Sequence, residues 1–308
     1  MAQRMESVAP PGGVMLSEST VRLVGAAVTL GEPEWKHIKG AAERVRAWQL
    51  LAVTPRSLAE GRTEAALVGR SRELSVLNAM LNRAIGRSGT VVQLTGAPGI
   101  GKSRTARELA TRAESLGIEV YWSFCESHTS DVAFHAVTRL LRSALRLTDL
   151  GAEAARMRLC AAMPDADAND LLLLEDLLGI AESEVPIPQL DPEVRRRRII
   201  GLINHASMRR QKPALYVIED VHWIDTVSEF MLALLLDVIP STASMVLITH
   251  RPEYRGLLRR VEGAETLTLA PLDDSDIAAV VRELVGSDPS VGAVAALITE
   301  RAAGNPFF

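Results

Sequence analysis

The chain has 308 residues, of which 47% are hydrophobic and 23% charged, so it is neither wholly disordered nor collagen-like. Its formal net charge of −4 gives no overall basic field that would draw it onto nucleic acid or an anionic lipid surface. Its two cysteines, Cys125 and Cys160, exclude a disulfide framework and form no zinc-binding pattern. No stretch approaches the roughly 20 apolar residues of a membrane-spanning helix, and the first residues lack the apolar core of a signal peptide. We therefore expect a cytoplasmic protein with no membrane partner.

The composition divides the chain into a short first segment, a linker and a larger remainder. Residues 1–53 contain β-prone pieces at 24–30 and 44–53, and they are too few to build a convincing core alone. Residues 54–65 are polar and contain proline and glycine, which is typical of a linker.

From residue 65 onward, strand patterns alternate with helix patterns, which predicts a mostly parallel α/β sheet flanked by helices. Asp191-Pro-Glu predicts a helix start, with Asp as the N-cap and Pro in the first turn. The expected strands are 90–95, 118–122, 214–218, 244–249 and 267–269. The expected helices are 103–116, several segments within 132–180, one from Asp191 to about 210, 227–238, and two within 273–303.

The segment Gly96-Ala-Pro-Gly-Ile-Gly-Lys-Ser103 matches the phosphate-binding pattern GxxxxGK[ST]. Glycines let the loop wrap so that backbone N–H groups point at phosphate oxygens, and the following helix adds its positive end. Lys102 is expected to reach the β- and γ-phosphates, and the Ser103 hydroxyl to bind Mg²⁺. The predicted nucleotide-binding residues of this loop are Gly96, Ala97, Pro98, Gly99, Ile100, Gly101, Lys102, Ser103 and Arg104.

The segment Leu215-Tyr-Val-Ile-Glu-Asp220 is an apolar strand that ends in two carboxylates. Such a strand places one acid beside Mg²⁺ and a second acid where it orients water. Glu219 stands where the metal-side acid is usually Asp, so we expect it to reach the metal through water. Asp220 then takes the water-side role, although the two roles are exchangeable. Glu219, Asp220 and Ser103 are the predicted metal ligands.

The strand 244–249 ends in His250 and Arg251, and the carboxyl ends of parallel strands line the crevice where ligands bind. Arg251 is therefore a candidate for contact with the γ-phosphate, the alternative being a solvated loop arginine. His250 is at least as well explained by packing or capping as by sensing. His222 and Trp223 are read as packing residues.

Two further segments carry weaker signals. The tripeptide Val68-Gly-Arg70, ahead of the P-loop strand, could place backbone near the adenine of a nucleotide, but it is too short to be specific. The run Arg195-Arg-Arg-Arg198 lies on a predicted helix, where four consecutive residues spread around the circumference. A solvated, salt-bridged helix explains this run better than nucleic-acid contact does.

Residues 66–308 resemble the STAND branch of AAA+-like ATPases, the Orc1-like modules of bacterial signalling proteins. The motifs that carry the resemblance are Leu67-Val-Gly-Arg70, the P-loop, Val217-Ile-Glu-Asp-Val-His-Trp-Ile-Asp225, Leu247-Ile-Thr-His-Arg-Pro252 and Gly304-Asn-Pro-Phe-Phe308. The resemblance implies a P-loop ATPase core at 66–261 and the start of a helical lid at 262–308. It also implies adenine contacts for Gly69, Arg70, Asn305 and Pro306, and γ-phosphate sensing for Arg251.

Residues 1–53 resemble the end of a class III adenylate/guanylate cyclase domain, a small α+β remnant, through residues 2–17, Ile38-Lys-Gly40 and 45–53. Arg4 matches the transition-state arginine of such cyclases, whereas the asparagine and the metal-binding aspartates would lie before Met1. The resemblance implies a fragment of a large actinobacterial cyclase-ATPase regulator of the LuxR type, with no cyclase activity of its own.

The sequence thus predicts an ATP- or ADP-binding, Mg²⁺-dependent signalling switch with slow or no hydrolysis. Its expected partners are nucleotide and other protein domains or subunits of a signalling complex, without direct nucleic-acid binding. Two alternatives from other classes are a cyclase-related protein and a P-loop small-molecule kinase.

Overall fold

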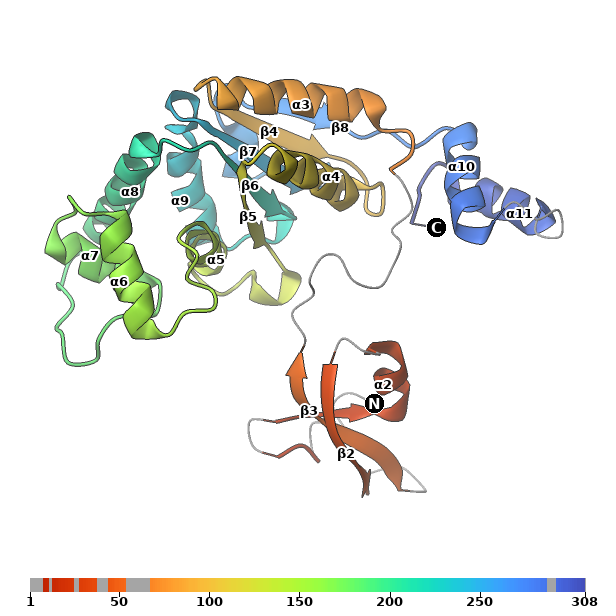
Figure 1. Cartoon of the computed structure of the whole chain (residues 1–308), viewed down its shortest axis with the longest axis horizontal. Helices are drawn as coiled ribbons and strands as arrows, with labels where there is room; N and C mark the ends of the chain where they lie inside the picture. The colour runs from red at the N-terminus through yellow and green to blue at the C-terminus, as the bar shows by residue number, and fades with distance from the viewer. Residues whose placement is uncertain are drawn as a thin grey trace. The chain divides into compact units, whose positions relative to one another are not determined.

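We describe a computed structural model of the chain, for residues 8–10, 13–24, 28–37, 44–53, 67–286 and 292–307 (Figure 1). The chain divides into two compact units, Met1–Glu64 and Ala65–Phe308. The predicted linker at 54–65 and the candidate cyclase residue Arg4 lie outside the described residues.

The smaller unit contains a three-stranded antiparallel sheet in the order β1-β3-β2. Its elements are β1 (Val14–Ser17), α2 (Glu18–Val24), β2 (Val28–Lys36) and β3 (Val45–Val53). The prediction at 44–53 matches β3. Of the strand predicted at 24–30, residues 28–30 belong to β2, residues 25–27 lie outside the described residues, and Val24 is a correction because it ends helix α2. The Ser17 hydroxyl accepts the Thr20 N–H, and Glu18 pairs with Arg22 at 2.6 Å, so local capping and charge outweigh the β-propensity of the valine.

The larger unit is built on a five-stranded sheet in the order β5-β6-β7-β4-β8, in which all neighbouring strands are parallel. The strands are β4 (Thr90–Thr95), β5 (Glu119–Phe124), β6 (Ala214–Glu219), β7 (Ser244–His250) and β8 (Glu265–Thr268). All five predicted strands are therefore present, each within three residues of its expected position. The strands β4 and β6, which precede the two phosphate-site motifs, are separated by β7.

Helices cover both faces of this sheet, as the predicted fold class requires. Side chains that alternate along the strands point to opposite faces: Val92 and Leu94 pack with α3 (Ser71–Ile85) and α4 (Lys102–Ser115), whereas Val91 packs on the other face. That other face is covered by α5 (His135–Ala144), α8 (Pro192–Arg209) and α9 (Thr226–Leu236), with α6 (Ala152–Ala162) and α7 (Ala168–Leu177) beyond them.

Helix α8 begins where its capping residues predict. Asp191 accepts the N–H of Glu193 at 2.9 Å and Pro192 occupies the first turn of α8, as expected. The arginine run of α8 is also salt-bridged as expected. Arg195 pairs with Asp176, Arg196 and Arg197 with Glu193, and Arg198 with Asp170.

The last two helices, α10 (Asp274–Val285) and α11 (Gly292–Ala302), pack on each other at the end of the sheet opposite to α6, α7 and α8 (Figure 1). They form a small core of their own with Leu272, Ile277, Val281 and Ala302. Within the described residues, no helix combines the length and the apolar content that a bilayer crossing requires.

Candidate functional site

The P-loop connects the fully buried strand β4 to the first turn of α4. Gly99 and Gly101 have φ angles of 78° and 102°, in the left-handed region that favours glycine. A Cβ atom at Gly99 would also lie 2.6 Å from Cβ of Phe307. Gly101 is the N-cap of α4, and its carbonyl accepts the N–H of Thr105 at 2.9 Å. The two glycines thus turn the chain directly from the end of the sheet into a helix N-terminus.

The side chain of Lys102 folds back into this loop. Its Nζ atom donates hydrogen bonds to the carbonyl oxygens of Gly96 at 2.9 Å and Ala97 at 3.0 Å, and the residue is buried. Burial lowers the pKa of Lys102, and the neighbouring charge of Asp220 partly opposes this effect. The loop therefore holds a desolvated cation whose hydrogen bonds go to backbone oxygens of the loop itself.

Glu219 ends β6 and is buried beside the first turn of α4. The Ser103 hydroxyl donates a hydrogen bond to its carboxylate, while the Oε1 atom is buried without a hydrogen-bond partner. Burial raises the pKa of Glu219, and the bond from Ser103 partly opposes it. The structure thus joins the two motifs that the sequence places more than a hundred residues apart.

Asp220 follows Glu219 in a left-handed conformation with a φ angle of 55°. Its N–H donates to the hydroxyl of Thr249 at 2.9 Å, so the end of β7 fixes the turn. The Asp220 side chain is 42% exposed, in contrast to the buried Glu219. The two carboxylates therefore face different surroundings, one dry and one open to solvent.

His222 lies next to this turn, with Nδ1 3.7 Å from Oδ1 of Asp220. Both ring nitrogens are buried without a hydrogen-bond partner, and burial lowers the pKa of the ring. The neighbouring Trp223 packs on it with ring centroids 5.2 Å apart. The imidazole is therefore packed, as the sequence suggested, but its polar atoms are unsatisfied.

Arg251 follows β7, and its guanidinium lies over the ring of Trp223 at 5.9 Å from the centroid. His250 pairs with Thr95, the residue before the P-loop, so Arg251 lies at the same end of the sheet as the P-loop. Its charge lowers the pKa of both Lys102 and His222, as a smaller cause than burial. His250 is buried, with Nδ1 donating to the carbonyl oxygen of Arg251 at 2.8 Å. It therefore packs at the strand end, in agreement with the packing interpretation.

Arg70 has a more definite position than its tripeptide predicted. Its side chain is buried, donates from Nη2 to the carbonyl oxygen of Ile100 at 3.1 Å, and pairs with Glu73 at 3.2 Å. Arg70 thus holds the P-loop through the backbone of Ile100. Gly69 has a φ angle of 71°, and a Cβ atom there would lie 2.3 Å from Oδ2 of Asp276 in α10. The segment that contains Gly69 and Arg70 therefore contacts both the P-loop, at Ile100, and helix α10, at Asp276.

The segment after α11 returns to the P-loop. The amide of Asn305 donates to the carbonyl oxygen of Pro98 at 3.0 Å, and Gly304 accepts the N–H of Leu272 at 2.8 Å. Pro306 follows Asn305 and is half-buried. Arg104, which the sequence also assigned to nucleotide, pairs with Glu108 at 3.5 Å along α4.

Two residues that support the site were not predicted from the sequence. Thr249 fixes the turn at Asp220, and its only sequence signal is its place at the end of an apolar strand. Asp225 is buried and accepts three backbone N–H groups, from Phe134, Ala136 and Ser228. Its N-cap position before α9 was readable from the sequence, but its link to α5 was not.

The side chains that could hold a divalent cation are those of Ser103, Glu219 and Asp220. A hydroxyl and two carboxylates are the hard oxygen donors that Mg²⁺ prefers, and Mg²⁺ usually takes one or two carboxylates together with substrate phosphates. The unpartnered Oε1 atom of Glu219 is an acceptor without a donor, which fits a nearby cation. This donor set therefore suits Mg²⁺ bound together with a nucleotide.

Comparison with protein families decides the class of this unit. The AAA ATPase domain model matches residues 66–248, more than half of the chain. The chain belongs to the AAA ATPase domain family. The match contains both strands of the candidate site, the P-loop between β4 and α4, and the carboxylates Glu219 and Asp220.

An uncharacterized protein of Rhizobium meliloti (strain 1021) is 27% identical over 287 residues, which is 90% of this chain and 28% of that protein. The chain thus spans just over a quarter of this relative. Among solved structures, the Aeropyrum pernix Orc1 protein in complex with DNA has a TM-score of 0.44 and 14% identity, covering 79% of this chain and 58% of that one. Cdc6p of Pyrobaculum aerophilum has a TM-score of 0.46 and 14% identity, covering 76% and 54%. Domain III of the Thermotoga maritima replication initiation protein DnaA has a TM-score of 0.44 and 13% identity, covering 79% of this chain and 80% of that one.

Proposed function

We propose that the larger unit is an ATP-binding switch of the STAND type, in which the bound nucleotide sets the position of the segment 262–308. The observation that carries the proposal is the hydrogen bond from Asn305 to the carbonyl oxygen of Pro98. Phosphate binding would change the conformation of a loop that already contacts this segment. The position of the segment would therefore depend on the bound nucleotide. Membership of the AAA ATPase domain family supports nucleotide binding.

In this proposal, Lys102 leaves the carbonyl oxygens of Gly96 and Ala97 and binds the phosphates, while the helix N-terminus at Gly101 adds backbone N–H groups. Bound Mg²⁺ would neutralise phosphate charge, held by Ser103 and the carboxylates of Glu219 and Asp220. Arg251 lies where its charge adds to that of Lys102. Gly69, Arg70, Asn305 and Pro306 surround the loop on the side proposed for adenine.

We propose slow or absent hydrolysis. Glu219 is buried and its pKa is raised, so part of its population is neutral at a pH where an ordinary glutamate is charged. A protonated carboxyl binds Mg²⁺ poorly, because the metal prefers charged oxygen ligands. Asp220 is exposed and remains the better candidate for orienting water. A weaker hold on Mg²⁺ leaves less positive charge to stabilise the transition state, so this arrangement supports slow hydrolysis.

The two alternative functions receive less support. A small-molecule kinase needs an acceptor site, and the family match gives no reason to expect one. A working cyclase needs residues that the segment 1–53 does not contain, and we expect no cyclic nucleotide from this chain with Mg²⁺ or Mn²⁺. We propose that the output passes to other protein domains or subunits and that the protein acts in the cytoplasm.

Titration of the full chain with Mg-ATP tests the proposal. Lys102→Ala should weaken binding by roughly 10- to 150-fold, because charge-assisted hydrogen bonds are worth about 1.5–3 kcal/mol. Lys212→Ala is the matched control, since Lys212 is exposed and precedes β6 at the opposite end of the strand from Glu219. Equal affinity of Lys102→Ala and the wild type would remove the proposed function. Hydrogen exchange at 292–307 that is the same with ADP and with a non-hydrolysable ATP analogue would remove the switch.

A further inference from the structure

The helix-covered face of the sheet opposite to α3 and α4 contains a cavity of about 380 Å³. Its walls come from α5, α8, α9, β6 and β7, and none of the residues assigned to the P-loop site lines it. The cavity is open to solvent on one side, because Asp165, His205 and Arg209 of its lining are exposed. Its volume lies within the range of pockets that bind small molecules.

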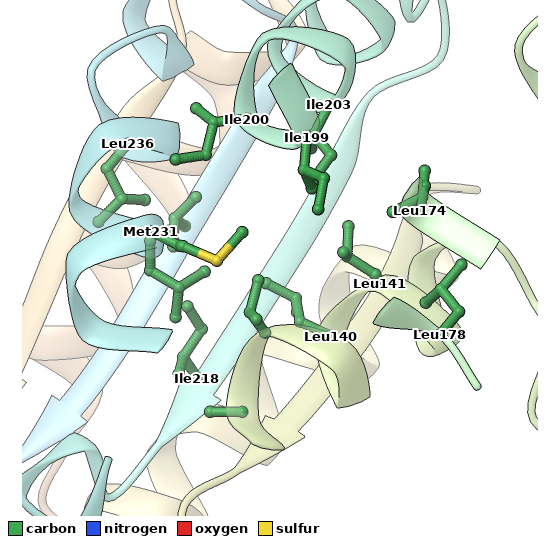
Figure 2. Close-up of a cluster of buried hydrophobic side chains, with 14 of the residues drawn as sticks. Leu140, Leu141, Leu174, Leu178, Ile199, Ile200, Ile203, Ile218, Met231 and Leu236 are labelled. Atoms are coloured by element: carbon green, nitrogen blue, oxygen red, sulfur yellow. The ribbon is translucent and has the colours of Figure 1, made fainter. Parts of the chain in front are cut away.

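The inner walls of the cavity, between the helices and the sheet, are mainly aliphatic. Figure 2 shows Leu140 of α5, Ile203 of α8, Ile218 of β6 and Leu236 of α9 facing one another across the helix–sheet interface. Each of these side chains is buried. These walls offer no hydrogen-bond partner to a charged or strongly hydrated ligand. Transfer of an apolar ligand group from water to this surface is favourable.

Polar groups gather at one part of the lining, where α8 ends and the loop between α6 and α7 passes. Arg209 of α8 pairs with Asp165 of that loop at 2.6 Å, and both side chains are more than half exposed. Arg210 also lines the cavity, and its guanidinium bonds to Glu119 and to the hydroxyl of Tyr121. The salt bridge between Arg209 and Asp165 is therefore the exposed and exchangeable contact of this rim.

Two arginines of the rim, Arg209 and Arg210, are the groups that can pair with an anionic ligand. Arg210 is already paired with Glu119, so Arg209, whose partner Asp165 is exposed, is the group available to an incoming anion. The hydroxyl of Tyr216, on β6, is a further polar group of the lining. Burial raises the pKa of Tyr216, and the adjacent charge of Arg210 partly opposes this effect. An incoming carboxylate can replace Asp165 on Arg209 without leaving a buried charge unpaired, since Asp165 is exposed.

We propose that this cavity binds a small amphipathic carboxylate, such as a medium-chain fatty acid. Its apolar chain occupies the space between α5, α8 and α9, and its carboxylate takes the place of Asp165 on Arg209. The ligand contacts β6 and β7 through Ile218 and Val246, one and three residues before Glu219 and Thr249. The site is separate from the proposed nucleotide function and stands or falls without it.

Calorimetric titration of the full chain with decanoate tests this inference, with decanol and decylamine as ligands of matched chain length. Decanoate should bind saturably at one site and more tightly than either of the others. In the wild type it should slow hydrogen exchange in α8 and β6 and leave the P-loop unchanged. Absence of saturable binding, equal binding of decylamine, or protection confined to other elements would overturn the proposal.

Two variants that fill the cavity locate the site. Ala206→Phe on α8 and Ala144→Phe on α5 each add a ring to the lining and should weaken decanoate binding by at least about 10-fold. The midpoint of urea unfolding, which does not depend on nucleotide, reports whether each variant is folded. Wild-type decanoate affinity in whichever of these variants retains that fold would place the ligand elsewhere.

A third variant tests the headgroup. Arg209→Gln should weaken decanoate by roughly 2- to 5-fold, a small effect because the side chain is exposed, and should leave decanol unchanged. Arg83→Gln is its control, since Arg83 forms a similarly exposed pair with Glu265 at 2.8 Å and does not line the cavity. If both variants weakened decanoate binding equally, the effect would come from the net charge of the protein, and the proposed contact between Arg209 and the carboxylate would be wrong.

Discussion

The side-chain amide of Asn305 donates a hydrogen bond to the carbonyl oxygen of Pro98 at 3.0 Å, although 207 positions separate the two residues in the chain. The same Asn305 accepts the N–H of Phe307 at 3.1 Å, which fixes the amide in place. A Cβ atom at Gly99 would lie 2.8 Å from Oδ1 of Asn305, so the P-loop tolerates this contact only with glycine there. The tip of the P-loop and the end of the described chain therefore form one structure.

We expect Asn305→Ala to loosen the segment 292–307 from the P-loop. One exposed neutral hydrogen bond is worth about 0.5–1.5 kcal/mol, so hydrogen exchange in α11 should rise by roughly 2- to 12-fold. Asn169→Ala, on the exposed first turn of α7, is the control. Unchanged exchange in α11 would show that the packing of Leu272 and Ile277 alone holds it.

Arg70→Lys should weaken Mg-ATP binding because the guanidinium supports the P-loop through Ile100. Lysine keeps the charge but concentrates its donors on one nitrogen, so it cannot reproduce the planar fork whose two nitrogens reach Ile100 and Glu73 separately. The buried acceptor that is left costs about 1–3 kcal/mol, which urea unfolding should register. Arg72→Lys, on the exposed face of the same turn, should change neither quantity. Loss of stability with unchanged nucleotide affinity would mean that Arg70 supports only the fold.

Glu219→Gln should stabilise the nucleotide-free and Mg²⁺-free protein at neutral pH, by roughly 1 kcal/mol. The raised pKa of Glu219 means that the folded state binds its proton more tightly than the unfolded state. That contribution is fully present below the ordinary glutamate pKa and is lost as the pH rises through the raised value. The wild type should therefore lose stability relative to the variant as the pH rises from about 4 through the raised pKa of Glu219. Parallel curves in denaturant titrations across that range would contradict it.

The same two carboxylates should separate binding from turnover. Asp220→Asn should keep Mg-ATP affinity within a few-fold and lower any phosphate release, because its exposed carboxylate occupies the water side. Glu219→Gln should chiefly reduce the Mg²⁺-dependence of binding. If Asp220→Asn abolished binding while Glu219→Gln left it intact, the two roles would be reversed. If the wild type shows no turnover, the pair serves binding alone.

The strands of the larger unit and the P-loop were predictable because their signals are local. The apolar run 214–218 predicts β6, and Asp191-Pro predicts the start of α8, each from the residues of the segment itself. Helix α3 was missed although Leu77, Leu81 and Ala84 recur at helical spacing. The periodic spacing of these apolar residues would have been enough to predict α3 from the sequence.

Other features depend on contacts between distant segments and have no local signal. The place of β7 between β4 and β6 follows from pairing such as Thr90 with Met245. Arg70 could not be assigned to Ile100, nor Asp225 to the start of α5, because both contacts arise only once the layers pack. The cavity is likewise a property of five elements together.

The position of β4 between β7 and β8 in the larger sheet also determines when this unit can fold during synthesis. Its two partners, β7 and β8, both come much later in the chain, and every residue of β4 is buried in the finished sheet. Until the ribosome has released residues beyond 268, the P-loop strand has exposed backbone and apolar side chains with no native partner. Such long-range pairing slows folding and exposes intermediates to aggregation. Nascent chains that stop before β7 are thus expected to depend on chaperones, and those that extend past β8 to become resistant to protease.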